Sequence, residues 1–293
     1  MRGSASANSR PRCLLHRRQV VVVFLISLLA LLNGCRSDRR RPSTAIPADA
    51  AGVHSYSTNF LQTENPITEG GVWIGGSDGG ASLRQGGHIW RGGRLWGDVQ
   101  TDSGFAFGVD EPTKYGDPTA ILAGNWGPDQ TVSAVVKVRS TPDKGCCHEV
   151  ELRLRTTISS LSITGYEAYC SVIPGTPYCH VARWNGPNGS YWNFETHSPA
   201  TYLQNGDVIK ATVTGANPSV ITFYKNGEQI MQAIDTGAAG GGFGAFGPWT
   251  SGNPGIGFYD DRDDQWRDFG LSSFSATDAS RIAPANQSPR PVR

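Results

Sequence analysis

The sequence predicts an all-β domain, built as an antiparallel β-sandwich of the jelly-roll type. The chain of 293 residues contains 37 glycines, 10% aromatic residues and only 17% charged residues. That composition differs from the Ala-, Glu-, Lys- and Leu-rich profile of a helical bundle. No long stretch keeps the apolar spacing of an amphipathic helix, whereas short alternating segments bounded by turn residues recur along the chain. We therefore expect one sandwich domain with many short strands.

Nine segments carry the strand pattern most clearly: 131–139, 148–158, 163–172, 178–184, 208–213, 220–225, 229–234, 255–259 and 268–276. Between 220–225 and 229–234, the Asn226-Gly227 pair favours a tight hairpin, because both residues tolerate positive φ. The segment 148–158 alternates most regularly. The residues on one face of this strand are apolar and include Val150, Leu152, Leu154 and Ile158. The residues on the other face are charged: Glu149, Glu151, Arg153 and Arg155.

The first 34 residues have the pattern of a signal peptide, with a basic segment before an apolar one. Five arginines and no acidic residue precede or flank the apolar run 20–32, which is shorter than the roughly 20 residues that a membrane-spanning helix needs. The run ends at Leu32-Asn33-Gly34-Cys35. This segment resembles a lipobox, and the resemblance implies cleavage before Cys35 and acylation of that residue, which gives stable membrane anchoring. The alternative is ordinary secretion, with Cys35 incidental.

Residues 35–52 are polar and aperiodic, and they are expected to form a tether between the lipid and a sandwich at 53–278. Residues 279–293 are expected to be a disordered tail. Arg36 follows the lipidated Cys35 where an Asp would retain a lipoprotein at the inner membrane, so the outer membrane of a bacterial envelope is favoured, with the domain facing the periplasm or the cell surface.

The body of the chain is acidic. Residues 52–278 hold 14 basic and 23 acidic residues, a net charge of 14 − 23 = −9. Binding to a phosphate backbone depends on clustered Lys and Arg. The charge therefore argues against a nucleic-acid partner.

Four segments of the C-terminal half form a recognisable series: Gly206-Asp207-Val208, 222–227 (TFYKNG), 252–258 (GNPGIGF) and the closing segment 268–276. Together they resemble the C-terminal half of concanavalin A-like lectin and glucanase domains. This resemblance implies a fold extending over roughly 60–278. It does not assign an activity, because this superfamily contains lectins, hydrolases, lyases and adhesion modules.

In such sandwiches the ligand lies across one concave sheet, and strand alternation predicts which side chains face it. The expected oligo- or polysaccharide-binding residues are Glu151, Arg153, Arg155, Glu167, Tyr169, His180 and Trp184, with Tyr178 on the same face. Sugar rings stack on aromatic faces, and carboxylates and guanidinium groups hydrogen-bond sugar hydroxyls. The alternative is a solvated sheet face with cross-strand ion pairs, on a structural or adhesion lipoprotein.

The sequence carries only part of the catalytic motifs of the hydrolases and lyases of this superfamily. Laminarinase-like hydrolases of this fold carry E-x-D-x-x-E or E-x-D-x-E. Here Glu149 and Glu151 are the only catalytic candidates, because Arg153 or Leu154 stands where the second catalytic Glu belongs. Alginate-lyase-like members carry R-x-E-x-R, of which only Glu151-Leu152-Arg153 fits. Hydrolysis and lyase chemistry are therefore secondary to binding.

The cysteines of the domain suggest disulfide bonds. In an exported chain the four residues Cys146, Cys147, Cys170 and Cys179 suggest two disulfides. We favour the two connectivities that tie Cys146 and Cys147 to the 170–179 hairpin over the one with a vicinal bond. Zinc ligation by these cysteines with His148 or His180 is a weaker alternative, because no C-x-x-C spacing occurs.

The acidic turn 260–264 is a candidate Ca²⁺ site. Its candidate ligands are Asp260, Asp261, Asp263 and Asp264, and an exposed acidic turn without a metal is the alternative.

Overall fold

The computed structural model describes residues 54–76, 83–85, 88–90, 97–109, 117–142, 147–159, 162–187, 191–194, 199–237, 247–260 and 265–279. The expected signal peptide, Cys35, the rest of the tether to residue 52, and residues 280–293 of the expected tail lie outside these residues, whereas Ala279 is the last residue of a strand. Within the described ranges the regular structure consists of strands. They include no helix long and apolar enough to cross a membrane.

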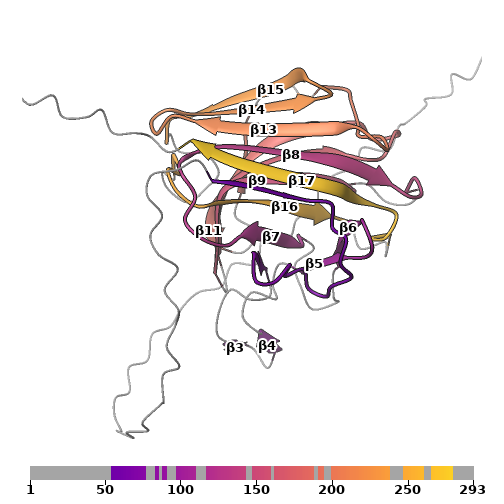
Figure 1. Ribbon diagram of the computed structural model, residues 1–293. Helices are drawn as coiled ribbons and strands as arrows, with labels where there is room; N and C mark the ends of the chain where they lie inside the picture. Colours follow the sequence, from indigo (N-terminus) through magenta and orange to yellow (C-terminus); the bar gives the residue numbers. More distant parts are fainter. Residues whose placement is uncertain are drawn as a thin grey trace, which may run out of the picture. The chain divides into compact units, whose positions relative to one another are not determined.

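The strands form two large antiparallel sheets that face each other (Figure 1). The eight-stranded sheet runs in the order β15 (Glu228–Asp235), β14 (Ser219–Lys225), β13 (Val208–Thr214), β8 (Asp129–Val138), β17 (Phe269–Ala279), β6 (Ala106–Val109) and β5 (Asp98–Thr101), with β1 (Ser55–Thr58) also paired to β17. The seven-stranded sheet runs in the order β12 (Tyr191–Asn193), β11 (Cys179–Pro187), β10 (Ser162–Ser171), β9 (Glu149–Ser159), β16 (Asn253–Tyr259), β7 (Thr119–Leu122) and β2 (Trp73–Gly75). A separate hairpin pairs β3 (Leu83–Gln85) with β4 (His88–Trp90).

The chain changes sheet repeatedly. It passes from β7 to β8 and back to β9, from β12 to β13, and from β15 through β16 to β17, and each of these steps crosses between the two sheets. All pairings between strands are antiparallel. The predicted all-β jelly-roll sandwich is thereby confirmed.

Hydrophobic burial between the sheets explains why these strands pack as they do. On β9, Val150, Leu152 and Leu154 are fully buried, and they share one core cluster with Tyr166 and Ala168 of β10. The eight-stranded sheet supplies the opposite layer of the core, from residues such as Val132, Ala134, Ala211, Val213, Ile221, Phe223, Phe274 and Ala276. Burying apolar area of this extent is the main favourable contribution to folding.

All nine predicted strands are present, with ends within a few residues of those expected. The sequence pattern missed the strands before residue 129 and β12. These are only three or four residues long, and alternation over so short a length gives no clear period.

Candidate functional site

The outer face of β9, β10 and β11 gathers most of the predicted site residues. The register places Glu151 opposite Tyr169, and Tyr169 opposite His180. Arg153 lies opposite Glu167 in the same way. These residues alternate along each strand with the residues of the core, so their side chains project from the opposite face of the sheet, as the sequence predicts.

Arg153 lies at the centre of a buried charge cluster on this face. Its Nη1 donates to Glu167 at 2.6 Å and its Nη2 donates to Glu151 at 2.5 Å. Asp117, two residues before β7, places its Oδ1 3.7 Å from Nη2. The indole N–H of Trp184 also donates to Glu167. Charge-assisted hydrogen bonds of this kind are the strong ones, and they compensate for removing the charges from water.

Glu151, Arg153, Glu167 and Trp184 were expected to be exposed to solvent, and this expectation is wrong. Glu151 and Arg153 are 0% exposed, and Glu167 and Trp184 are 3% exposed. The expected face is correct, but its central part is interior rather than solvated. The predicted ligand-binding roles of Glu151, Arg153, Glu167 and Trp184 are therefore replaced by a buried ion cluster, with Trp184 covering the Arg153 guanidinium at 5.2 Å from its ring centroid.

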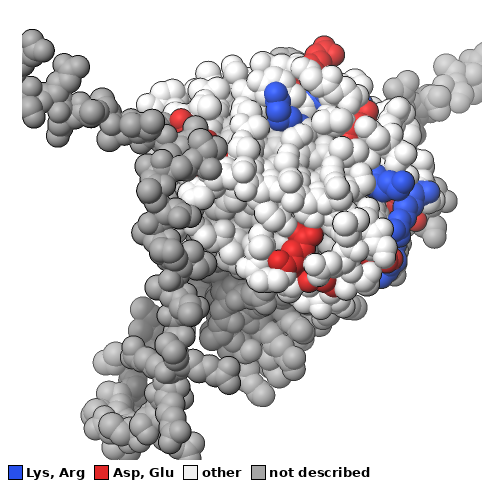
Figure 2. Space-filling view, viewed as in Figure 1, with Lys and Arg blue, Asp and Glu red and all other residues white. Residues whose placement is uncertain are grey.

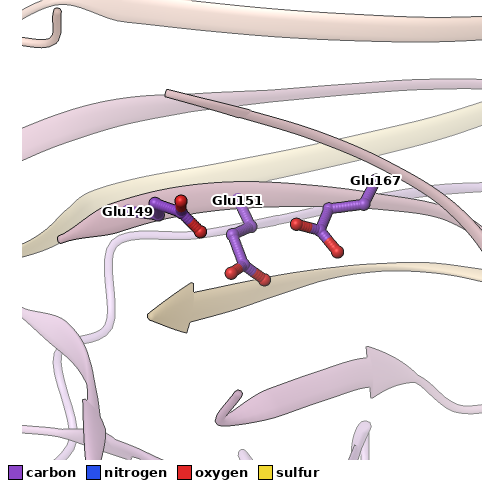
Figure 3. A group of neighbouring side chains, drawn as sticks. All are labelled: Glu149, Glu151 and Glu167. Carbon is purple, nitrogen blue, oxygen red and sulfur yellow. The ribbon is translucent and has the colours of Figure 1, made fainter. Parts of the chain in front are cut away.

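Three carboxylates meet in this cluster, as Figure 3 shows. Glu149, Glu151 and Glu167 each offer an oxygen, and these oxygens lie within 4.8 Å of one another. Such a group could hold a cation. Arg153 already donates to two of the three, so part of the negative charge is balanced by the chain itself.

Burial raises the pKa of Glu151 well above its ordinary value, although the Arg153 charge acts in the opposite direction and the neighbouring Glu167 adds to the rise. Burial likewise raises the pKa of Tyr169 and of Tyr178, with Glu149 contributing to both. Burial lowers the pKa of His180, so its imidazole is neutral at pH 7. The face therefore combines neutral hydrogen-bonding rings with a carboxyl that resists ionisation.

An aromatic edge borders the buried cluster. The rings of Tyr169, Tyr178 and His180 contact one another, with centroids 5.5 to 6.3 Å apart. The Tyr178 hydroxyl donates to Glu149 at 2.5 Å. Tyr178, His180 and Glu149 are partly exposed, whereas Tyr169 is buried and bonds Asn193 at 3.1 Å. We call Glu149, Tyr178 and His180 the aromatic edge.

Two residues that shape this face, Gly257 and Asp117, were not predicted from the sequence. Gly257 on β16 pairs with Glu151, and a Cβ on Gly257 would lie 2.2 Å from a Glu151 oxygen and 2.8 Å from Arg153 Nε. The absent side chain therefore leaves the space that the ion cluster occupies. Asp117 was also missed, because it precedes a short strand and has no motif. The Gly-Ile-Gly run was the available signal for Gly257.

Arg155 was expected beside Glu151 and Arg153, and this expectation is wrong. A bulge shifts the register between β9 and β10 near Gly165, and Arg155 takes a φ of 48° within it. The side chain consequently turns toward the eight-stranded sheet. It is fully buried and donates to Pro128 O, Ser219 Oγ, Gly215 O and Trp249 O at 2.5 to 2.8 Å.

The favoured disulfide connectivities are also wrong. Cys170 bonds Cys179 across the β10–β11 hairpin, where the two residues are register partners. That bond excludes any link from either residue to Cys146 or Cys147. Cys146 lies outside the described residues.

The acidic turn is only partly described. Asp260 is fully buried, accepts the Gln265 N–H at 2.9 Å and lies 3.2 Å from His148 Nε2. It is thus an interior residue rather than part of an exposed acid cluster. Asp261, Asp263 and Asp264 lie outside the described residues, and Ca²⁺ binding there stays a prediction.

The fold and this face define a class, an antiparallel β-sandwich with acidic and aromatic side chains on one sheet. No protein-family model matches the chain, and no curated protein matches it. Among solved structures it is similar to an endo-1,3-β-glucanase from Streptomyces sioyaensis (TM-score 0.44, 12% identity, 79% of this chain and 98% of that one). It is also similar to the Emp46p carbohydrate recognition domain (TM-score 0.43, 9% identity, 75% and 95%) and to the carbohydrate-binding module CBM66 from Bacillus subtilis (TM-score 0.41, 12% identity, 73% and 96%). These likenesses concern the fold alone.

Proposed function

We propose that this protein is a carbohydrate-binding β-sandwich that takes an oligo- or polysaccharide at the aromatic edge. One observation supports this most: two partly exposed rings, Tyr178 and His180, lie side by side next to the partly exposed carboxylate of Glu149. A sugar presents an apolar C–H face and a rim of hydroxyls. Rings suit the first, and a carboxylate suits the second.

The buried cluster supports this site by fixing its geometry. Glu149 and Glu151 are on one strand, and Glu151 is held by Arg153, which is held in turn by Glu167 on the next strand. Binding groups on strands with locked neighbours lose little freedom when a ligand arrives. The ion cluster is accordingly a positioning element, and the aromatic edge is the contact surface.

A glycan array tests the proposal. Wild-type protein should retain a defined set of glycans, and Tyr178→Ala should lose those that bind at the aromatic edge, because it removes both a ring and the hydrogen bond to Glu149. Tyr224→Ala is the matched control: Tyr224 is a partly exposed tyrosine on the eight-stranded sheet, where it packs on Lys210. Absence of any glycan binding at millimolar concentration, or equal loss in both variants, would contradict the proposal.

We further propose that lipid on Cys35 anchors the domain in the outer membrane of a bacterial envelope. The support is the sequence Leu32-Asn33-Gly34-Cys35 after a basic and then apolar segment. Expressed in a bacterial host, wild-type protein should incorporate labelled palmitate and sediment with membranes, whereas Cys35→Ser should do neither. Labelling that survives Cys35→Ser would contradict the anchor.

A further inference from the structure

A second concave site lies on the outer face of the eight-stranded sheet, on the opposite layer from the aromatic edge. It is a cavity of about 620 Å³ where β1, β8 and β17 run side by side. That volume is in the range typical of small-molecule sites. Seven of the twelve lining residues carry hydroxyl or amide groups, and the others are Glu69 and the apolar residues Leu61, Ala134, Val135 and Phe274. We call it the β1 cavity.

Glu69 is the one charged residue in the lining of the β1 cavity. Thr58 Oγ1 donates to Oε1 at 2.5 Å and Trp73 Nε1 donates to Oε2 at 2.7 Å, and the Tyr56 hydroxyl also donates to Oε2. A carboxylate has about four acceptor positions, and these three donors leave one for a ligand. The three bonds also hold the carboxylate in a single orientation.

The floor of the cavity is an ordered row of hydroxyls. Ser57 pairs with Ser275, and Ser275 pairs with Ser133, so three serines lie in register across adjacent strands. Neighbouring strands are about 4.8 Å apart. A second row two residues along the strands continues the pattern with Thr277, Thr131 and Thr212. Figure 2 shows that the face over which β13, β8 and β17 run carries few charged side chains.

The wall of the cavity adds an apolar surface. Leu61 is 78% exposed, one of the most exposed large apolar side chains among the described residues. It stands beside the amides of Asn59 and Gln62 in the same loop. A leucine next to amides and hydroxyls offers both apolar contact and hydrogen bonds to a ligand in the cavity.

We propose that the β1 cavity is a second binding site, for a neutral saccharide. Glu69 accepts a sugar hydroxyl, the serine row and the amides of Asn59 and Gln62 bond further hydroxyls, and Leu61 packs on the C–H face of the ring. Because the only charge in the lining is negative, an anionic sugar is repelled. The hydroxyl rows give a longer chain a continuous polar surface beyond the cavity.

The test uses cellohexaose, laminarihexaose and maltohexaose as neutral probes and an alginate hexamer as the anionic one, with binding followed by saturation-transfer NMR. At least one neutral probe should bind. Ser275→Tyr, which fills the cavity, should abolish binding. Gln62→Ala, in its exposed loop, should weaken binding about three- to tenfold, the loss expected when one ligand hydrogen bond is removed. Thr214→Tyr, an exposed position on the same sheet away from the cavity, is the control and should bind normally.

Tyr178→Ala separates this site from the aromatic edge, because it should leave binding at the β1 cavity unchanged even if the first site is lost. The inference is overturned if no neutral probe binds, if Ser275→Tyr and Gln62→Ala bind like the control, or if the alginate hexamer binds as well as the neutral probes.

Discussion

Arg153 and Glu167 lie opposite each other on β9 and β10, and the guanidinium donates to the carboxylate at 2.6 Å with both side chains inside the protein. The pair joins the strand that carries Glu149 to the strand that carries Tyr169. It explains why an alternating charged strand, which normally faces water, is buried here. The ion pair and its neighbours replace solvent as partners for these charges.

Removing Arg153 should therefore be costly. Arg153→Met leaves Glu151 and Glu167 without the guanidinium that both accept from, and breaking a buried pair in this way costs about 3–5 kcal/mol. Urea denaturation at pH 7 measures the free energy of unfolding. Arg267→Met is the control, since Arg267 is 63% exposed and only 3.5 Å from Asp102, and exposed pairs contribute about 0–1 kcal/mol. Equal losses in the two variants would contradict the buried cluster.

Glu151 should make stability fall as pH rises. Burial raises its pKa in the folded protein, so between the unfolded pKa, about 4.3, and the raised value the folded state binds more protons. Its contribution is fully present below that unfolded pKa and is lost as pH rises through the folded one. Glu151→Gln removes this dependence, so the variant should gain stability relative to wild type from pH 4.5 toward pH 8, as measured by urea denaturation at several pH values. A constant difference across that range would show that Glu151 is not perturbed.

Gly257 should tolerate no side chain. Gly257→Ala places a methyl group 2.2 Å from a Glu151 oxygen, and overpacking of this kind costs about 1–3 kcal/mol. Gly175→Ala is the matched control, because nothing lies within 4 Å of its added Cβ, and it should change stability by less than about 0.5 kcal/mol. Thermal unfolding compares the two, and a Gly257→Ala protein as stable as the control would rule out the tight contact.

The Cys170–Cys179 bond should be structural. Replacing both buried cysteines with alanine should lower the free energy of unfolding by about 2–4 kcal/mol, the usual contribution of a disulfide. Peptide mapping under non-reducing conditions checks the pairing directly. A peptide that links Cys147 to Cys170 or Cys179 would refute the assignment.

Alternation in the sequence predicted the sandwich and the face of most site residues, because the period of two in a strand is a local property. Val150 and Leu152 are buried between the sheets, and Glu151 and Arg153 point the other way. The error at Arg155 has a local cause as well, since one bulge reverses parity beyond it. Bulges leave little trace in a single sequence, and the hints here were Gly165 and Gly252, which both lie against the Arg155 backbone.

Burial of the charged face could not be predicted, because it depends on residues far apart in the sequence. Asp117, Trp184 and Gly257 come from three different strands or their flanks, and only the assembled sheet brings them to Arg153. The pairing of the cysteines could not be predicted for the same reason. Its pairing follows from the β10–β11 register, which sets Cys170 opposite Cys179, and cysteine spacing alone left three connectivities open.

The central claim is that a saccharide binds at the aromatic edge, and NMR titration of the histidine ring signals tests it most directly. A glycan that the wild type retains and Tyr178→Ala does not is added to labelled protein, and the His180 imidazole resonances are followed in both proteins. The account predicts saturable shifts at His180 in the wild type and their loss in Tyr178→Ala. Saturable glycan binding that leaves the His180 signals unmoved would contradict it.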